Sequence, residues 1–159
     1  MEYRRIFADG YSYYLTLVTH QRKPILINNI EQLRQAFRYS KKNYDYTIDA
    51  IVILPDHLHM IITPKIAKEY PKIITNIKRA FVYQTVGRGI LTPTIKETKT
   101  NLTPSKYKRN HAGIWQERYY EHTIRDEKDL LEKMEYIKNN PIKHALVEDI
   151  KDWRYSSFT

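Results

Sequence analysis

The residues best suited to chemistry are two histidines separated by one position, His57 and His59, at the end of an apolar run. In a β-strand, alternate side chains share a face, so both imidazoles would lie side by side while Leu58 and Met60 turn into the core. Two neutral imidazoles on a rigid strand form half of a divalent-metal site. A His-x-His pair is also short enough to arise by chance, with each ring simply hydrogen-bonded, and this motif alone does not separate the two interpretations.

A second pair of polar residues lies far downstream, in a segment with helical periodicity. Tyr136 and Asn140 are one helical turn apart, on a different face from Met134 and Ile137. The spacing therefore places a phenol beside an amide carbonyl near a helix end. Judged alone, the pair is better explained by an amphipathic tyrosine at the core boundary and a polar cap before Pro141.

Together, the two pairs suggest phosphoryl chemistry. An ion held by two imidazoles and a carbonyl oxygen keeps open positions, with which it can polarise a phosphoryl oxygen and stabilise developing charge. A nearby tyrosine can then attack phosphorus as a covalent nucleophile, although a reference pKa of about 10 means that it needs such help at neutral pH. Tyr119 and Tyr120 are alternative nucleophiles, and His122 is an alternative ligand that we interpret as a strand-surface or supporting histidine.

The hydrophobic pattern predicts the elements that must position these side chains. Only Pro55 and Asp56 separate two apolar segments, so an antiparallel hairpin is expected there, with the histidines near the start of its second strand. Asp126 is a candidate N-cap, and Pro141 should end the last helix at or before Asn140. The order indicates an α+β sandwich, with helices packed on a central antiparallel sheet. The expected strands are 11–19, 46–54, 57–63 and 114–124, and the expected helices are 30–42, 71–86 and 126–139.

Composition limits the class of protein. The 159 residues fit a single domain, 1–159, and the absence of cysteine excludes disulfides, thiolate metal sites and cysteine nucleophiles. No apolar stretch approaches the ~20 residues that cross a bilayer, and the N-terminus lacks the apolar region of a secretory signal. We therefore expect a cytoplasmic protein with no membrane association.

Positive charge is concentrated in one part of the chain. Residues 65–112 carry eleven Lys and Arg against two Glu, which accounts for the whole net charge of +9. Such a segment is typical of a protein that binds a polyanion, although basic surface also aids solubility. Its second half, at about 90–112, lacks apolar periodicity and is expected to be a long basic loop. The candidate nucleic-acid contacts are Lys78, Arg79, Arg88, Lys106, Lys108 and Arg109.

Five motifs, taken together and in this order, resemble those of REP-associated tyrosine transposases. These proteins form the single-tyrosine branch of the HUH (histidine–hydrophobic–histidine) endonucleases. The resemblance covers nearly the whole chain, and its specificity comes from the set rather than from any one motif. The motifs are LPDHLHM at 54–60, IKR at 77–79, WQERYY at 115–120, YIKNNP at 136–141 and DWRYSSF at 152–158.

The resemblance implies a site and a reaction. His57 and His59 would be the imidazole ligands of Mg²⁺ or Mn²⁺, with Asn140 as the third protein ligand. Tyr136 would cut single-stranded DNA beside a hairpin-forming repeat, leaving a 5′-phosphotyrosyl enzyme and a free 3′-OH. The implied fold is a ferredoxin-like or RRM-like sandwich.

Several alternatives stay open at this stage. The chain could be a transposase-derived module that binds hairpin DNA or RNA without cutting it, or a nuclease that uses a metal-activated water and no tyrosine. Either a monomer or a homodimer that exchanges tyrosine helices is compatible with the resemblance. Neither the target sequence nor the physiological metal can be derived from the residues.

Overall fold

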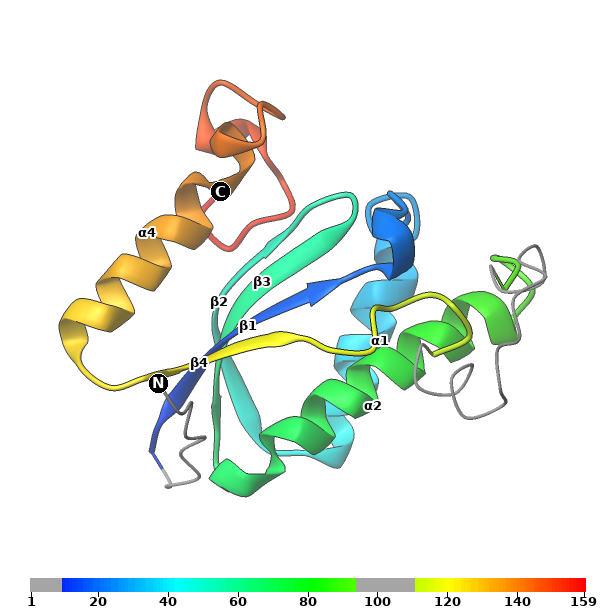
Figure 1. Ribbon diagram of the computed structural model, residues 1–159, viewed down its shortest axis with the longest axis horizontal. Helices are drawn as coiled ribbons and strands as arrows, with labels where there is room; N and C mark the ends of the chain where they lie inside the picture. Colours follow the sequence, from blue (N-terminus) through cyan, green and yellow to red (C-terminus); the bar gives the residue numbers. More distant parts are fainter. Residues whose placement is uncertain (1–9, 94–110) are drawn as a thin grey trace.

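An antiparallel sheet of four strands separates two helical layers (Figure 1). The computed structural model describes residues 10–93 and 111–159. The sheet order β2-β3-β1-β4, with one helix between β1 and β2 and another between β3 and β4, is the split βαβ arrangement of ferredoxin-like folds. The expected fold class is thereby confirmed. The strands are β1 (Ser12–Val18), β2 (Tyr46–Ile53), β3 (His57–Pro64) and β4 (Tyr120–Ile124).

The larger hydrophobic core lies between the sheet and helices α1 (Ile30–Asn43) and α2 (Tyr70–Val82). Alternate residues of the central strands enter it, and Leu58 and Met60 of β3 are both fully buried there, as the strand periodicity predicts. After α2 the chain widens into a single π-helical turn, Tyr83–Gly87, in which the Thr85 hydroxyl donates to the Phe81 carbonyl at 2.6 Å. The whole predicted helix 71–86 is therefore helical, with a change of geometry in its last turn.

The opposite face of the sheet is covered by a single helix, α4 (Glu127–Lys143) (Figure 1). A smaller apolar cluster joins them, formed by Tyr14, Val52 and Ile61 from the strands and Ile137 from α4. The central strand β3 is consequently buried on both faces, which explains why its sequence is nearly continuously apolar apart from the two histidines. This second layer is the one that brings α4 against the histidine face of β3.

The predicted hairpin is confirmed, and its register is explicit. β2 and β3 pair antiparallel with Val52 opposite His59 and Ile53 opposite Leu58. The turn between them is held from outside by backbone bonds, since Thr19 N–H donates to the Asp56 carbonyl and Leu26 N–H to the Pro55 carbonyl, both at 2.9 Å. A rigid turn at this point fixes the start of the strand that carries the histidines.

Pro141 does not end the last helix, and that prediction was wrong. α4 continues through Pro141 to Lys143, with the proline ring buried. Proline removes one hydrogen bond from the helix, and its ring crowds the carbonyl one turn earlier, but here the backbone continues in helical geometry to Lys143. The following turn is closed normally, because His144 N–H donates to the Asn140 carbonyl at 3.1 Å and Leu146 N–H to the Pro141 carbonyl at 3.0 Å. The helix is thus extended beyond the tyrosine and asparagine.

The strand expected over 114–124 is much shorter in the structure. Only Tyr120–Ile124 pairs with β1, and Trp115 forms a single isolated bridge with Thr19. The Gln116 N–H still donates to the Val18 carbonyl of β1 at 2.9 Å, while the Gln116 carbonyl accepts a 2.9 Å hydrogen bond from the Lys78 ammonium of α2. An aromatic-rich sequence favours a strand, but before Tyr120 the pairing with the end of β1 is limited to an isolated bridge.

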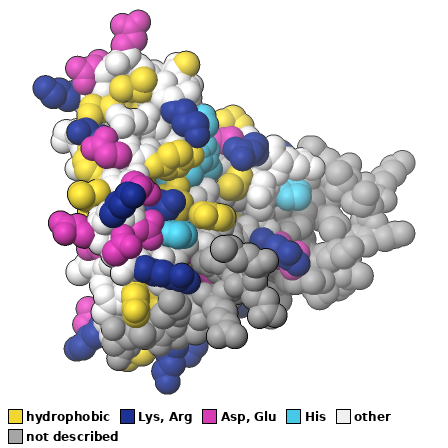
Figure 2. Space-filling model, turned by 60° about the vertical axis from the view of Figure 1, so that its left-hand side comes forward, with side chains coloured by type: hydrophobic (Ala, Val, Ile, Leu, Met, Phe, Trp, Pro, Cys, Tyr) yellow, Lys and Arg dark blue, Asp and Glu magenta, His cyan; other side chains and the backbone are white. Residues whose placement is uncertain are grey.

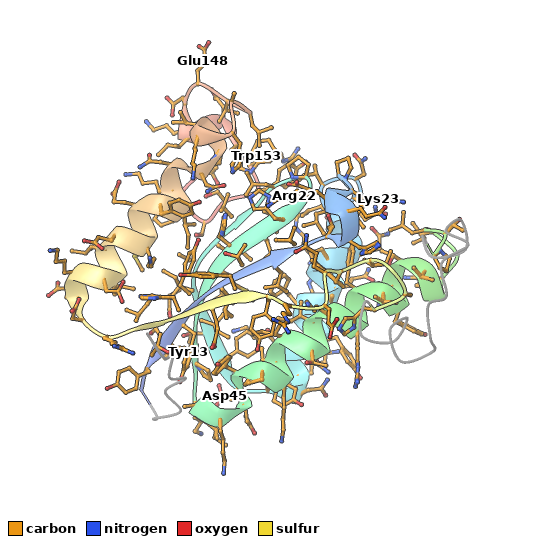
Figure 3. The ribbon with its side chains drawn as sticks, in the orientation of Figure 1. Tyr13, Arg22, Lys23, Asp45, Glu148 and Trp153 are labelled. Carbon is orange, nitrogen blue, oxygen red and sulfur yellow. The ribbon has the colours of Figure 1, made fainter. Side chains whose placement is uncertain are left out.

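The C-terminal segment covers the outer edge of the sheet. Ser156 forms an isolated bridge with Val52, and the Trp153 indole N–H donates to the Ile53 carbonyl at 2.9 Å. Figure 3 shows Trp153 and Arg22 at the same end of the sheet, near the β2–β3 turn, with Asp45 at the other end. Among the helices of the described ranges, none has the length and hydrophobicity that crossing a membrane requires.

The start of α4 is stabilised by a side-chain cap that can be tested. The Asp126 carboxylate accepts a 2.7 Å hydrogen bond from the Asp129 backbone N–H, as the sequence predicts for an N-cap. We expect Asp126→Ala to lower the free energy of unfolding by about 1 kcal/mol, measured by urea denaturation. Glu127→Ala removes an acid from the same turn but no capping bond, and should cost less than about 0.5 kcal/mol. Equal decreases in the two variants would contradict the capping role.

Candidate metal and nucleophile site

His57 and His59 lie on the face of β3 that α4 covers, and both side chains are buried. Their ring centroids are 5.0 Å apart, with the ring planes at 81°. The adjacent apolar residue Leu58 faces the other layer, as strand alternation requires. The structure therefore places the two imidazoles beside each other in a largely water-excluded position.

The orientation of His57 is set by its neighbour Asp56. The Nδ1 atom of His57 lies 2.6 Å from the Asp56 carboxylate, and the Arg22 guanidinium donates to the same carboxylate at 3.3 Å. Burial acts to raise the pKa of Asp56, but the hydrogen bond and charge of His57, followed by those of Arg22, lower it overall. A carboxylate on Nδ1 leaves Nε2 as the ligand atom, which is the usual arrangement behind a metal-bound histidine.

His59 is held from β1. Its Nδ1 atom lies 2.9 Å from the Tyr14 hydroxyl and 2.8 Å from the Thr16 hydroxyl. Burial, followed by the positive charges of His57, His144 and Lys143, lowers the pKa of His59 to about 3. The imidazole is therefore neutral at physiological pH, which is the form that binds a metal.

Asn140 is the candidate third donor. Its side chain is 0% exposed, and neither its Oδ1 nor its Nδ2 atom has a hydrogen-bond partner among the described residues. The Nε2 atom of His59 is buried in the same unsatisfied state. Burying such groups without partners costs free energy, so their presence points to a ligand-binding role. The unsatisfied atoms of these two side chains fit a divalent ion held by His57, His59 and Asn140.

The composition of this set is unusual for a protein metal site. Within residues 10–93 and 111–159, no three His, Cys, Asp or Glu side chains are grouped so that they could hold one ion. Asn140, through its neutral amide oxygen, is the candidate for the third protein donor. A site with two imidazoles, one amide and no carboxylate keeps the positive charge of the ion available to an anionic phosphate.

Tyr136 lies next to this set. Its ring centroid is 5.3 Å from that of His59, and the side chain remains 39% exposed, so the hydroxyl can be reached from solvent. The predicted pairing with Asn140 along the helix is present, and Asn140 lies between Tyr136 and His144, which contact His59 and His57, at four-residue spacing on one face. Tyr136 also contacts Tyr14 edge to face, with 6.3 Å between centroids.

The alternative residues occupy other positions. Tyr119 packs against the larger core on the α1–α2 side of the sheet. Tyr120 is exposed and touches Tyr14 from β4, with 6.1 Å between centroids. His122 pairs with the Asp129 carboxylate, its Nε2 lying 2.7 Å away, which joins β4 to α4.

Two residues at the end of α4 belong to this neighbourhood and were missed from the sequence. The Lys143 ammonium donates to the Tyr136 hydroxyl at 3.1 Å. His144 lies against His57, with 5.0 Å between ring centroids. The expectation that Pro141 would end the helix concealed both of them. The signal that could have found Lys143 is its spacing of seven positions from Tyr136, which is two helical turns.

A shallow hollow opens beside His57. It has a volume of about 280 Å³, and its lining includes Arg22, Asp56, His57 and His144. Figure 2, which turns the left-hand side of the molecule forward, shows histidine side chains reaching this surface among interspersed basic and acidic ones. An extended polyanion could therefore approach the histidine pair from solvent.

Of the predicted nucleic-acid contacts, the three that the structure describes do not gather around Tyr136. Lys78 is buried, donates to the Gln116 carbonyl and lies 5.6 Å from the Tyr119 ring centroid. Burial, partly opposed by Glu117, lowers the pKa of Lys78 to about 8. Its ammonium is therefore occupied in holding the chain before β4 and has little surface for a phosphate.

Arg79 and Arg88 are exposed in the helical layer opposite α4. Arg79 lines two neighbouring hollows of about 260 and 570 Å³, the larger of which also contains the exposed rings of Tyr39 and Tyr83. Arg88 donates to the Gln84 side chain at 3.1 Å. Lys106, Lys108 and Arg109, with most of the predicted loop 90–112, lie outside the described residues.

Comparisons with known proteins identify the family. The model of the family described as "Transposase IS200 like" matches residues 8–140, which include β1 to β4 and most of α4. A REP-associated tyrosine transposase of Escherichia coli is 30% identical over 99% of this chain and 82% of that protein. A Haemophilus influenzae protein provisionally named in the same way is 38% identical over 98% of this chain and 84% of that protein.

Solved structures give the same result. A REP-associated tyrosine transposase bound to a REP hairpin superposes with a TM-score of 0.76 at 29% identity, covering 99% of this chain and 82% of that one. A Deinococcus radiodurans protein provisionally called a transposase shares the fold, with a TM-score of 0.51 at 20% identity, over 87% of this chain and 97% of that one. On its family match, its relatives and its fold, this chain belongs to the IS200-like transposase family, as a REP-associated tyrosine transposase.

Proposed function

We propose that this protein is a metal-dependent nuclease and strand transferase for single-stranded DNA, with Tyr136 as its nucleophile. The observation that carries the proposal is the grouping of an accessible phenol with two buried, unsatisfied side chains. The Tyr136 ring lies 5.3 Å from His59, and the His59 Nε2 atom and the Asn140 amide have no partners in the described part of the chain. A buried asparagine with a purely structural role would be expected to have hydrogen-bond partners for its amide group.

The proposed site residues have different roles in the reaction. A divalent ion on His57, His59 and Asn140 would polarise the scissile phosphate and stabilise its developing charge. The Tyr136 oxygen attacks phosphorus while the bond to the 3′ oxygen breaks, so the 5′ phosphate stays on the enzyme and a 3′-OH is released. The phenol proton passes to solvent, and the departing 3′ oxygen takes up a proton. Because the phosphotyrosyl bond replaces a phosphodiester, a 3′-OH can reverse the step without ATP.

The chain's own contacts pre-arrange this site. Asp56 and Arg22 fix the His57 ring, while Tyr14 and Thr16 fix His59 from β1. Burial raises the pKa of Tyr14 to about 12, against the opposing hydrogen bond from Thr16, so its hydroxyl stays neutral. Fixed partners of this kind keep the donors in place before the substrate binds.

Hairpin-forming DNA is the proposed substrate. One relative was solved with a REP hairpin, and it covers 99% of this chain. Arg79 and Arg88 are exposed cations that we propose as phosphate contacts, together with Lys106, Lys108 and Arg109. Tyr39 and Tyr83, exposed beside Arg79, could stack on unpaired bases.

The central test is a covalent capture assay. Purified protein is incubated with Mn²⁺ and a labelled single-stranded oligonucleotide that carries a REP-type hairpin from its own genome, and then separated on a denaturing protein gel. A labelled band at the combined mass, absent with EDTA, is the expected result. Cleaved DNA without an adduct would indicate a water-using nuclease, and intact but retained DNA would indicate a binding module.

The proposed DNA contacts predict a measurable salt effect. Arg79→Gln should weaken hairpin binding, measured by fluorescence anisotropy. The slope of log K against log salt should become less steep by about 0.7 for each single-strand phosphate that the variant no longer neutralises. Arg34→Gln is the matched control, because Arg34 pairs with Glu31 on α1 and carries the same charge. If the two variants weaken binding equally, Arg79 contributes only net charge and does not touch a phosphate.

A further inference from the structure

The ammonium group of Lys143 lies directly on the oxygen of the proposed nucleophile. Its Nζ atom is 3.1 Å from the Tyr136 hydroxyl and 4.7 Å from the ring centroid. A lysine ammonium has three donors and no acceptor, so the phenol oxygen must accept this bond. The contact exists because α4 continues through Pro141 and carries Lys143 two turns beyond Tyr136.

Lys143 is not engaged by an acid that would cancel its charge. Within residues 10–93 and 111–159, its ammonium donates to the Tyr136 hydroxyl and forms no ion pair with an acidic side chain. Lys138, by contrast, lies 4.0 Å from the Glu135 carboxylate on the same helix. The positive charge of Lys143 therefore lies beside the Tyr136 oxygen without a neutralising carboxylate in the described part of the chain.

We propose that Lys143 is a catalytic residue whose ammonium group holds the Tyr136 oxygen and stabilises the negative charge on it during attack. In the forward step, the bond from the phenol oxygen to phosphorus forms, the bond to the 3′ oxygen breaks, and the phenol proton passes to solvent. In the reverse step, the same oxygen departs as a phenolate, and the ammonium stabilises that charge as well. The inference rests on the proposed function of Tyr136, which it extends to a second side chain.

Two other roles for Lys143 make different predictions. As a cation in the last turn of a helix, it would act through the helix dipole and affect stability but not rate. As a contact to a DNA phosphate, it would affect binding, so that saturating DNA would restore the rate. If Lys143 instead stabilises the reacting Tyr136 oxygen, its loss should slow adduct formation in the protein–DNA complex and leave the affinity for DNA nearly unchanged.

The experiment compares Lys143→Met, Lys143→Arg and the matched control Lys138→Met in single-turnover adduct formation with Mn²⁺ and saturating hairpin DNA. We expect Lys143→Met to slow the reaction about 10- to 100-fold, less than a buried oxyanion donor because the ammonium is exposed. Lys143→Arg should recover most of the rate, and Lys138→Met should stay within about 2-fold. Hairpin affinity should differ by less than about 3-fold between the two methionine variants.

The following outcomes would overturn the proposal. The first is an unchanged rate in Lys143→Met, and the second is an equal decrease in Lys138→Met. The third is a decrease seen only below saturating DNA, which would make Lys143 a phosphate contact. Thermal unfolding of each variant is measured in parallel. Lys143 has a structural role if the slower variant also has a lower Tm and Lys143→Arg does not recover the rate.

A second measurement separates this inference from the proposed function. Tyr136 is labelled with an aryl sulfonyl fluoride, which reacts with phenol oxygens, and its rate relative to Tyr120 is followed by peptide mass spectrometry without DNA or metal. Lys143→Met should reduce the Tyr136 rate about 10-fold relative to Tyr120, while Lys138→Met should not. If the native protein forms no DNA adduct, the proposed function fails, and the catalytic role of Lys143 fails with it. If the adduct forms but Lys143→Met leaves the labelling ratio unchanged, only the role of Lys143 is rejected.

Discussion

A Tyr136→Phe variant is expected to form no covalent adduct with single-stranded DNA, a decrease on the order of 10³-fold or more, as for other single nucleophile deletions. The reason is chemical, because the substitution removes only the oxygen that would bond to phosphorus. The ring, which packs 5.3 Å from His59 and 6.3 Å from Tyr14, stays in place. The measurement is the labelled protein band on a denaturing gel, with Mn²⁺ present.

The matched control is Tyr120→Phe. Tyr120 also contacts Tyr14 and is more exposed than Tyr136, so it would be the next tyrosine to react. Its variant should form adduct at a rate within about 2-fold of the native protein. An adduct that forms in Tyr136→Phe but not in Tyr120→Phe would identify Tyr120 of β4 as the nucleophile. Cleavage that survives in both, without any adduct, would indicate a water mechanism.

The second large effect is expected from His59→Ala, which should remove most of the Mn²⁺ binding. A ligand that binds only the folded state stabilises it, by about 2.7 kcal/mol when its concentration is 100-fold above Kd. The native protein should therefore show a clear rise in Tm with Mn²⁺, and the variant should show almost none. Differential scanning fluorimetry measures both, and titration calorimetry gives the affinities directly.

His122→Ala is the control for the metal experiment. It removes a histidine that pairs with Asp129 outside the site, so the rise in Tm with Mn²⁺ should be retained even if the starting Tm is lower. A metal response that is the same in His59→Ala and in the native protein would reject His59 as a ligand. Asn140→Ala should give an intermediate decrease, since two imidazoles remain.

Local sequence features were sufficient for the elements and for the histidine pair. Alternation along the strand places His57 and His59 on the face opposite Leu58, and the short turn at Pro55 and Asp56 forces an antiparallel hairpin. These conclusions hold because successive side chains in a strand point to opposite faces, so residues two positions apart share a face. The pairing of Tyr136 with Asn140 is local in the same way, since it depends on helical spacing.

Propensity failed where tertiary contacts outweighed it. The segment from Trp115 to Tyr119 has the aromatic content of a strand, but it meets the end of β1 only through an isolated bridge, and the Gln116 carbonyl accepts from the Lys78 ammonium instead of from a strand partner. Pro141 has the local signature of a helix end, yet the helix continues because a proline in the final turn removes a single hydrogen bond. The second error hid Lys143 and His144 from the sequence-based site.

The sequence by itself determined which residue types are present and which share a face within one element. Only the tertiary structure decided that α4 packs on the histidine side of β3, which brings Asn140 and Tyr136 to residues far earlier in the chain. It also decided that Arg79 lies in the opposite layer and that His144 meets His57. The physical reason is that periodicity defines directions within a helix or strand, whereas contacts between elements arise from burying their apolar faces together.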